Sequence, residues 1–487
     1  MNKKDILSIN AIKFLGIDAI NQANSGHPGI VLGAAPMAYL LFTNHLNINP
    51  NEPNWINRDR FILSAGHGSA MLYALNHLSG FDISLADIKN FRQLGNTPGH
   101  PEYGHTPGVE TTSGPLGQGI GNAVGMAMAE MHLAARFNQP EFDIFNYHTY
   151  VICGDGDLQE GVAMEAMSLA GHLGLSKLIV LYDSNDIQLD GPTNLAFSEN
   201  IKERFEAINW DYHLVKDGYD IHEINQAIIK AKKSNKPSLI EVKTVIGEDS
   251  INQGTSKTHG SPLGLADRNQ IAHKLNWGFE PFVVPEEVYE NFQDKVFNRG
   301  VDKYNKYQQM FAEYQEIYPK QAELLNKFYE EEIILDYHEL AKLITKDSDA
   351  TRNVSGMVIN NLSEKYLNII GGSADLTSST KAKGAENHFS KNTPLGRNIN
   401  YGVREHAMGA INNGIALSKA LRPFGGAFMV FSDYMKPAIR LAAIMDLPIV
   451  YVFTHDSLQV GEDGPTHQPV EQTLGLRAIP NLNVMRP

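Results

Sequence analysis

Residues 149–186, which read TYVICGDGDLQEGVAMEAMSLAGHLGLSKLIVLYDSND, decide the fold of this chain. TYVIC (149–153) and LIVLY (178–182) are short, apolar and rich in β-branched residues, a pattern typical of buried parallel strands. The segment EGVAMEAMSLAGHLG between them has helical spacing. Together these pieces predict a βαβ unit, and therefore an open, mostly parallel sheet with helices on its faces.

A second α/β pattern follows later in the chain. LNIIGGSADL precedes a helical REHAMGAINNGIALSKA, and then come PIVYVFTHDS and a final LNVMRP. Between the two patterns the sequence is charged, dotted with aromatic residues and mostly helical. We therefore predict an α/β fold with two successive open, mostly parallel sheets and helices on both faces. The predicted limits are 1–275 for the first domain, 276–342 for a helical interdomain crossing and 343–487 for the second domain.

The composition narrows the class of protein. The 487 residues carry 41 Lys and Arg against 55 Asp and Glu, a net charge of −14 that disfavours nucleic acid and anionic membranes as partners. The single cysteine, Cys153, excludes an intrachain disulfide. The longest nearly apolar stretch, 29–42, is too short to span a bilayer, and the N-terminus lacks a signal-peptide core. A cytoplasmic enzyme or binding protein is expected.

Asp155 and Asn185 each follow one of the two predicted strands of the βαβ unit. The carboxyl ends of parallel strands meet at one edge of a sheet, where open α/β folds bind their ligands. Carboxylate and amide oxygens suit Mg²⁺ or Ca²⁺, and a metal-bound diphosphate supplies further oxygens. The alternative is two ordinary Asp/Asn/Gly turns, which from these residues alone has equal weight.

A glycine-rich segment, TTSGPLGQG (111–119), precedes the predicted helix GIGNAVGMAMAEMHLAA. Glycines allow a ligand to approach the backbone closely, and a helix N-terminus favours anions. The alternative is a loop that packs tightly on a neighbouring helix, and without further context this alternative is favoured.

Several of the 18 histidines lie in tight polar turns. Flanking glycines let an imidazole approach a ligand, and histidine suits repeated proton transfer near neutral pH. The alternative for each is a solvated surface histidine. No HExxH or CxxC grouping is present, so a histidine-ligated zinc site is not indicated. The turn histidines are His27, His67, His100, His105, His259, His455 and His467.

Two further features come from the second α/β pattern. Phe428, Phe431 and Tyr434 are spaced three apart, so a helical turn would place their rings on one side, either to clamp a flat heterocycle or to pack in a core. Glu405, in YGVREHAM, stands at an expected helix start. Burial would keep its carboxyl neutral and able to donate a proton, whereas the helix dipole favours ionisation. The simpler alternative is a glutamate that stabilises the helix N-terminus.

These motifs, in this order, resemble the transketolase family along nearly the whole chain. NFRQLGNTPGHPEYGHTPGVETTSGPLGQGIGNAVGMA and REHAM match family segments, and the GDG…NN thiamine diphosphate motif is matched with Ser184 in place of its first Asn. The resemblance implies a thiamine-diphosphate-binding fold that uses thiamine diphosphate with Mg²⁺, Ca²⁺ or another divalent metal. It also implies a homodimer with active sites at the subunit interface.

The implied activity belongs to the pentose phosphate pathway. It is reversible transfer of a two-carbon ketol unit from a ketose phosphate such as xylulose 5-phosphate to an aldose phosphate such as ribose 5-phosphate.

The resemblance also assigns roles to individual residues. The implied metal ligands are Asp155, Asn185 and the backbone carbonyl of Ile187. Glu405 is implied to bond the cofactor's pyrimidine ring nitrogen, and His27, His259 and His467 to assist proton transfers. The implied cofactor contacts are His67, Gly114, Pro115, Leu116, Gly156, Glu160, Asn185, His259, Asp375, Phe428, Phe431 and Tyr434. The implied substrate contacts are His27, His100, His259, Arg352, Ser379, His455, Asp463 and His467. Ser379 lies in TSSTK, where the family usually has a proline and an asparagine.

Three alternatives to this assignment share part of its signal. Dihydroxyacetone synthase and deoxyxylulose phosphate synthase share the chemistry, but the latter lacks the long interdomain crossing. A non-catalytic transketolase-like subunit is opposed by the presence of Glu405, Asp155 and His259. The closing Arg486 and Pro487 resemble the start of a further family segment. The resemblance therefore implies that the end of the second domain and a C-terminal domain are missing.

Overall fold

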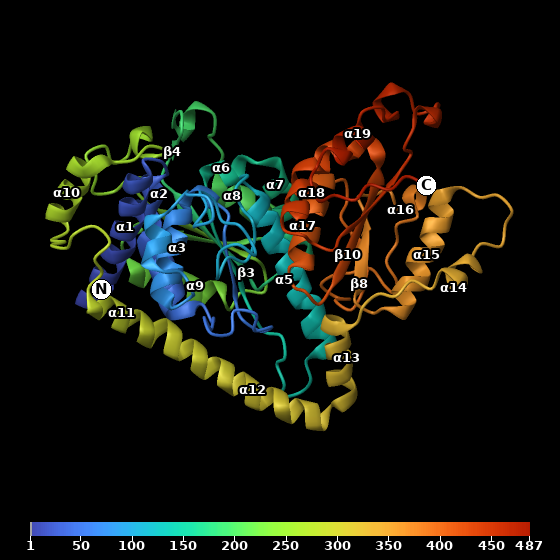
Figure 1. The fold of residues 1–487 in the computed structure, drawn as a ribbon, viewed down its shortest axis with the longest axis horizontal. Coiled ribbons are helices and arrows are strands. Elements are labelled where there is room, and N and C mark those ends of the chain that lie inside the picture. The colour runs from blue at the N-terminus through green and yellow to red at the C-terminus, as the bar shows by residue number, and fades with distance from the viewer. Residues whose placement is uncertain (1) are drawn as a thin grey trace. The chain divides into compact units, whose positions relative to one another are not determined.

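The structure, a computed structural model, describes residues 2–487. It divides into two compact units, which are described separately (Figure 1). Unit 1 is formed by Met1–Ile120, Tyr147–Met164 and Gly174–Gln309, and unit 2 by Gly121–Asn146, Glu165–Leu173 and Met310–Pro487.

Unit 1 is built on a five-stranded parallel sheet with the strand order β1-β2-β3-β7-β6. The predicted βαβ unit is confirmed, since β2 and β3 pair in parallel with Val151 opposite Val180, and α7 (Gly161–Leu173) connects them. A two-residue antiparallel ribbon, β4 (Ile187–Gln188) with β5 (Gly191–Pro192), follows β3. The strands are β1 (Arg60–Leu63), β2 (Thr149–Gly154), β3 (Leu178–Ser184), β6 (Asp211–Val215) and β7 (Ser238–Lys243).

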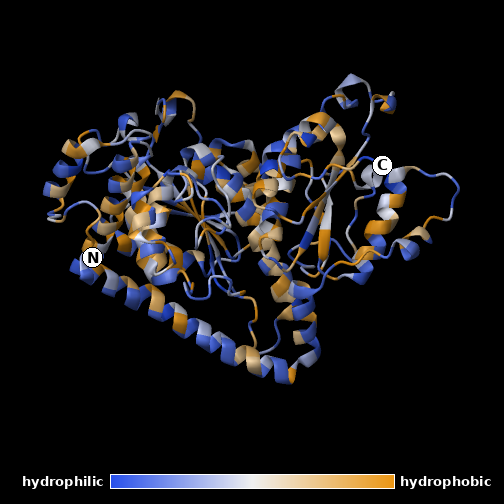
Figure 2. Ribbon diagram, viewed as in Figure 1, coloured by the Kyte–Doolittle hydropathy of each residue, from blue (hydrophilic) through white to orange (hydrophobic). Residues whose placement is uncertain are grey.

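The core of unit 1 lies around the central strands and the helices packed beside them. Every residue of β3 is buried, as is every residue of α2, which explains the nearly apolar run at 29–42. Figure 2 shows these strands mostly in the hydrophobic colour, whereas α12 (Arg299–Ile317) is mostly hydrophilic. The helices of unit 1 are α1 (Lys3–Ala23), α2 (Pro28–Leu40), α3 (Ser69–Ser79), α4 (Leu85–Lys89), α6 (Asp155–Gln159), α8 (Ile201–Ala207), α9 (Ile221–Ala231), α10 (Gly264–Lys274) and α11 (Glu286–Phe292).

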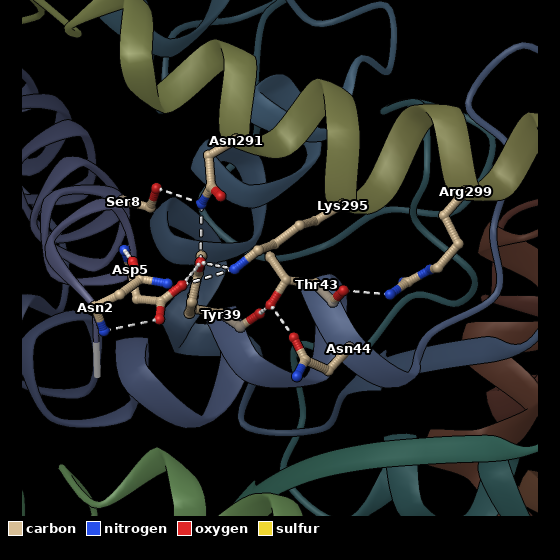
Figure 3. Close-up of polar contacts among 9 residues, drawn as sticks. All are labelled: Asn2, Asp5, Ser8, Tyr39, Thr43, Asn44, Asn291, Lys295 and Arg299. Atoms are coloured by element: carbon tan, nitrogen blue, oxygen red, sulfur yellow. Dashed lines mark hydrogen bonds and ion pairs between the residues drawn. The ribbon is translucent and has the colours of Figure 1, made fainter.

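Hydrogen bonds and ion pairs connect the start of the helical segment after residue 285 to α1 and α2 (Figure 3). The Lys295 ammonium lies 2.7 Å from Asp5 Oδ1, and the Tyr39 hydroxyl donates to the same oxygen at 2.7 Å. Arg299 donates to backbone carbonyls just beyond the end of α2. These charge-assisted bonds satisfy carbonyls that a helix end leaves free, and they fix the path of this segment.

Unit 2 contains a four-stranded parallel sheet with the order β11-β10-β8-β9. The predicted second sheet is thus confirmed, although the final LNVMRP forms neither helix nor strand. The strands are β8 (Ile369–Ser373), β9 (Asn398–Asn400), β10 (Arg422–Phe428) and β11 (Val450–Thr454). The helices wholly in this unit are α13 (Pro319–Glu330), α14 (Tyr337–Ala341), α15 (Thr351–Lys365), α16 (Thr377–Thr380), α17 (Glu405–Ala416), α18 (Ser432–Ile444) and α19 (Gln472–Arg477).

Within unit 2, α17 crosses α5 (Gln118–Phe137) in backbone contact. A Cβ atom on Gly125 would lie 2.0 Å from the Ile411 carbonyl oxygen, and one on Gly414 would lie 1.9 Å from that of Asn122. Only glycine allows this approach. The crossing fixes α17, whose first residue is Glu405. Among the described residues, no helix is both long and apolar enough to cross a membrane.

The fully buried His132 of α5 makes the stability of unit 2 depend on pH. Its Nδ1 lies 2.9 Å from the Pro394 carbonyl oxygen, and Arg136 donates to its Nε2 at 3.4 Å, so the imidazole is neutral. Burial, followed by the charge of Arg136, lowers the pKa of His132 to about 3. In the unfolded chain His132 therefore takes up a proton near pH 6.5, whereas in the folded chain it stays neutral at this pH. Folding stability is lost as the pH falls below 6.5.

We expect His132→Gln to remove this contribution. Between pH 6.5 and pH 5 the parent should lose about 2 kcal/mol of stability that the variant keeps, at about 1.4 kcal/mol per pH unit. Urea unfolding of both proteins at several pH values measures this difference. The matched control is His105→Gln at an exposed histidine, whose pH profile should follow that of the parent. A constant difference between His132→Gln and the parent across this range would show that His132 does not titrate on unfolding.

Candidate cofactor site

Asp155 begins α6 directly at the carboxyl end of β2 and is buried. The Tyr182 hydroxyl of β3 donates to Asp155 Oδ1. Burial, helped by the neighbouring carboxylates of Asp183 and Asp186, raises the pKa of Asp155 to about 7, although the hydrogen bond from Tyr182 opposes the change. Buried carboxylates gathered at one sheet edge repel one another. A divalent cation at this edge would relieve that repulsion, so the donor chemistry fits a bound metal.

Asn185 and Ile187 lie just beyond the end of the neighbouring strand β3. Asn185 Nδ2 donates to Asp183 Oδ2 at 3.0 Å, and the Ile187 amide donates to Asn185 Oδ1 at 3.1 Å. The sheet register pairs Gly154 with Asp183, so the two predicted ligand segments do reach the same edge. Among residues 2–487, no group of three or more His, Cys, Asp or Glu could hold a metal. The predicted ligands include only one carboxylate, and the metal site stays a prediction.

The glycine-rich loop packs against the GDG turn. A Cβ atom on Gly156 would lie 2.7 Å from Leu116 Cδ1, and one on Gly117 would lie 2.8 Å from Glu160 Cβ. Asp157 joins the two segments, because its Oδ1 accepts from the Gly117 amide at 2.7 Å. The structure thus brings together several predicted cofactor contacts that lie far apart in the sequence. Pro115, also in this loop, is exposed.

Four of the predicted histidines form one cluster in unit 1. The His27 ring centroid lies 5.1 Å from that of His67, 6.3 Å from that of His100 and 5.9 Å from that of His259. The His67 and His259 rings are stacked, with centroids 5.4 Å apart. Gly114 adjoins His100, since a Cβ atom there would lie 3.5 Å from His100 Cβ. His105, by contrast, is exposed.

These histidines are neutral at physiological pH. Burial, followed by the charges of His259, Arg92 and His100, lowers the pKa of His27 to about 4. Burial also lowers the pKa values of His67, His100 and His259. Within the described part of the chain, the Nδ1 atoms of His27 and His259 are buried without a hydrogen-bond partner. Unpartnered buried nitrogens are costly, so this cluster fits a polar ligand.

The predicted aromatic residues of unit 2 also lie together, but not on one helical turn. Phe428 ends β10, Phe431 ends a short 3₁₀ turn, and Tyr434 lies in the first turn of α18. The rings of Phe428 and Phe431 are stacked with centroids 5.9 Å apart, and Tyr434 lies 6.1 Å from Phe431. The expected side-by-side placement therefore arises from a strand–turn–helix junction. Tyr434 is largely exposed, which argues against simple core packing for this ring.

Predicted substrate contacts surround these rings. The His455 ring lies 3.8 Å from that of Phe428, and the His467 ring lies 5.4 Å from that of Phe431. Burial, followed by the charge of Arg352, lowers the pKa of His455, while Asp463 acts in the opposite direction. Arg352 and Asp463 therefore each lie within electrostatic range of His455. Asp375 lies between β8 and α16, and Ser379 lies within α16.

Glu405 is the first residue of α17 and is partly buried. Burial raises the pKa of its carboxyl group, and a hydrogen bond from its own backbone amide opposes this change. Glu165 lies in the same surroundings and accepts from the Ala407 amide at 2.9 Å. Its pKa is raised by burial and, to a smaller extent, by the charge of Glu405. Burial therefore raises the pKa values of both carboxyl groups, and each then accepts a proton at a higher pH than a solvated glutamate does.

Sequence reasoning did not single out three residues that contact these sites. Glu165 lies inside a helical segment without a motif signal, and Tyr182 is the last residue of LIVLY, which has the pattern of an ordinary core strand. Arg92 has a positive φ of 63°, and it donates to Ser25 Oγ at 2.9 Å in the turn before His27. Arg92 lies in the NFRQLG segment already quoted for its resemblance, which was the one available signal.

Two α/β units, each with a parallel sheet, carry these sites. One has an acidic sheet edge and a glycine-rich loop, and the other has a glutamate at a helix start and an aromatic cluster. They define the class of thiamine-diphosphate-binding α/β enzymes. The family described as "Transketolase, thiamine diphosphate binding domain" matches residues 4–333, and "Transketolase, pyrimidine binding domain" matches residues 347–487. The chain belongs to the transketolase family.

Individual relatives agree with this assignment. The transketolase of Bacillus subtilis (strain 168) is 55% identical over 99% of this chain and 73% of its own length. The structure of the Leishmania mexicana transketolase superimposes with a TM-score of 0.96 at 44% identity, covering 100% of this chain and 73% of that one. A Pichia stipitis transketolase in complex with sedoheptulose 7-phosphate has a TM-score of 0.94 at 43% identity, covering 99% of this chain and 73% of that one.

Proposed function

We propose that this protein is a transketolase, which transfers a two-carbon ketol unit from a ketose phosphate to an aldose phosphate. The observation that carries the proposal is the cluster of His27, His67, His100 and His259 beside the glycine-rich loop. It presents neutral imidazoles with unpartnered nitrogens where a polar substrate and a diphosphate would lie. The Pichia stipitis relative binds sedoheptulose 7-phosphate, which supports sugar phosphates as substrates.

Thiamine diphosphate would be held by both kinds of site, and it would supply the nucleophilic carbon that carries the ketol unit. Asp155, Asn185 and the Ile187 carbonyl would hold a divalent metal, with Mg²⁺ the first candidate, against the diphosphate. Gly114, Leu116 and Gly156 would line its path, since glycine permits close approach to the backbone. Phe428, Phe431 and Tyr434 would contact the pyrimidine ring.

The remaining residues of this chain would move protons or hold the sugar. Glu405, whose pKa is raised by burial, would hydrogen-bond the pyrimidine ring nitrogen. His27 and His259 would accept and return protons at the sugar hydroxyls, because their lowered pKa values leave both imidazoles neutral, each with an unprotonated ring nitrogen. Arg352 and His455 would bind the substrate phosphate, with guanidinium–phosphate pairing as the stronger contact.

We also propose that the protein acts as a homodimer in which residues of both subunits complete each site. Size-exclusion chromatography with light scattering checks this assembly.

A coupled assay tests the function. Purified protein is given xylulose 5-phosphate and ribose 5-phosphate, with and without thiamine diphosphate and Mg²⁺, and glyceraldehyde 3-phosphate formation is followed. We expect turnover that requires both additions. Cofactor binding without turnover of any ketose phosphate would instead favour the non-catalytic transketolase-like subunit. A preference for formaldehyde as acceptor would favour dihydroxyacetone synthase.

A further inference from the structure

Lys13, in the middle of α1, is a charged residue whose side chain is completely buried. Its ammonium nitrogen lies 3.3 Å from Asp249 Oδ2 and donates to the Tyr219 hydroxyl. Lys274 reaches Asp249 Oδ1 at 2.9 Å from the solvent side. The Asp249 side chain is only 10% exposed. A charge buried this deeply must be paired, and breaking such a pair leaves an uncompensated charge in the interior.

Asp249 lies in the segment between β7 and α10, residues 244–263, and its backbone is strained. Its φ is 70°, in the left-handed region that residues other than glycine seldom adopt. Gly247 and Gly254 on either side also have positive φ values, of 62° and 71°. A strained residue persists only where its surroundings hold it. Here the holding contacts are the ion pairs of the carboxylate and a 3.0 Å bond from the Asp249 amide to Gln253 Oε1.

The same segment packs directly on the histidine cluster. The Gly247 amide donates to the Gly29 carbonyl at 3.0 Å, two residues after His27. A Cβ atom on Gly29 would lie 2.7 Å from the Thr258 carbonyl oxygen, so the two backbones touch. Thr258 is fully buried, and the next residue is His259. Continuous contacts therefore run from Lys13 through Asp249 to His259.

We propose that Lys13 is a positioning residue, whose buried ion pair with Asp249 holds segment 244–263 in the conformation that places His259 against His27 and His67. Neither Lys13 nor Asp249 touches the candidate site. The inference rests on the proposed function, because it concerns how His259 is held for the ketol transfer. Loss of the ion pair would free the strained backbone at Asp249, and the misplacement would reach His259.

The experiment compares four variants of the full chain. Lys13→Met removes the charge and keeps the length, Lys13→Arg keeps the charge, and Asp249→Asn neutralises the partner. Lys4→Met is the matched control, because Lys4 lies on the same helix in an exposed 3.4 Å pair with Glu290, and exposed pairs contribute little. Hydrogen exchange of peptides covering 244–263, thiamine diphosphate affinity by calorimetry, and kcat and KM for xylulose 5-phosphate are measured.

We expect Lys13→Met and Asp249→Asn to speed exchange in 244–263 while β1, β2 and β3 stay protected. Turnover should fall about 10- to 100-fold, the size of effect that a displaced catalytic group produces. Lys13→Arg should restore most of it, and Lys4→Met should match the parent. In a His259→Ala background, adding Lys13→Met should lower turnover by a further factor of less than about two. The reason is that the effects of residues that act through one another are not additive.

Several results would overturn the inference. One is an equal loss of turnover on adding Lys13→Met to the parent and to His259→Ala. Another is a Lys13→Met variant with a lower melting temperature but an unchanged kcat. If Lys13→Met fails to fold, the same double-variant comparison is made with Asp249→Asn, which leaves Lys13 its Tyr219 contact. A parent protein that neither binds thiamine diphosphate nor turns over sugar phosphate would refute the proposed function instead, and the variants would then be judged by exchange in 244–263 alone.

Discussion

Glu405→Gln is expected to lower turnover by about 10² or more, the usual worth of a lost acid–base group. Glutamine keeps the size of the side chain and donates a hydrogen bond, but it has no carboxyl proton to give. Glu405 is the first residue of α17, and burial raises the pKa of its carboxyl group, which favours the protonated form that can donate. Steady-state kinetics with xylulose 5-phosphate and ribose 5-phosphate measure the effect.

The metal and diphosphate residues lie elsewhere in the chain, so the affinity of Glu405→Gln for thiamine diphosphate with Mg²⁺ should stay close to that of the parent. Glu364→Gln, at an exposed glutamate near the end of α15, is the matched control and should be fully active. If Glu405→Gln kept turnover within about twofold of the parent, too little for a lost acid–base group, Glu405 would be removed from the mechanism.

The two sheets could be predicted from sequence because their signal is local. TYVIC and LIVLY are apolar on both faces, a pattern typical of a strand covered by helices on both sides. The polar residues after each strand then had to meet at one edge, which is where the structure places Asp155 and Asn185. Here topology alone converts spacing along the chain into proximity in space.

The histidine cluster was beyond this kind of reasoning. His27, His67, His100 and His259 come from four separate turns, and no periodicity relates them. Their convergence depends on glycine contacts such as that of Gly29 with Thr258, which only coordinates reveal. The resemblance to a family named the same residues but gave no cause. The low pKa values also come from the assembled cluster, since burial is their first cause.

Glu165 shows what neither pattern nor resemblance supplied. In the sequence it is one glutamate in an apolar helical run, and its natural interpretation is a solvent-facing residue. In the structure it accepts the Ala407 amide near the start of α17 and shares its surroundings with Glu405. The two acids are far apart in the sequence, so no local sequence pattern indicates that they lie close together in space.

The aromatic residues Phe428 and Tyr434 differ from the prediction in another way. Spacing by three residues fits one helical turn, but it also fits the strand–turn–helix junction that the structure has here.

Asp155→Ala is expected to weaken thiamine diphosphate binding about 10- to 100-fold in the presence of Mg²⁺, since one charge-assisted contact contributes about 1.5–3 kcal/mol. The variant removes the only carboxylate among the proposed ligands, and the diphosphate would then face a poorly held metal. Excess cofactor and metal should restore part of the activity, because the residues proposed for proton transfer are untouched. Calorimetry of cofactor binding at several Mg²⁺ concentrations measures the loss.

Asp190→Ala is the matched control for this variant. Asp190 is exposed in the short turn between β4 and β5, close in sequence to Asn185 and Ile187, and it is not among the proposed ligands. Removing the Asp190 carboxylate tests whether any loss of negative charge near this sheet edge changes thiamine diphosphate binding. We expect the cofactor affinity of Asp190→Ala to equal that of the parent. If Asp155→Ala also bound the cofactor like the parent, the buried carboxylate would serve only the turn after β2. The role of Asp155 would then be to accept the hydrogen bond from Tyr182, and the metal would bind to other residues of this sheet edge.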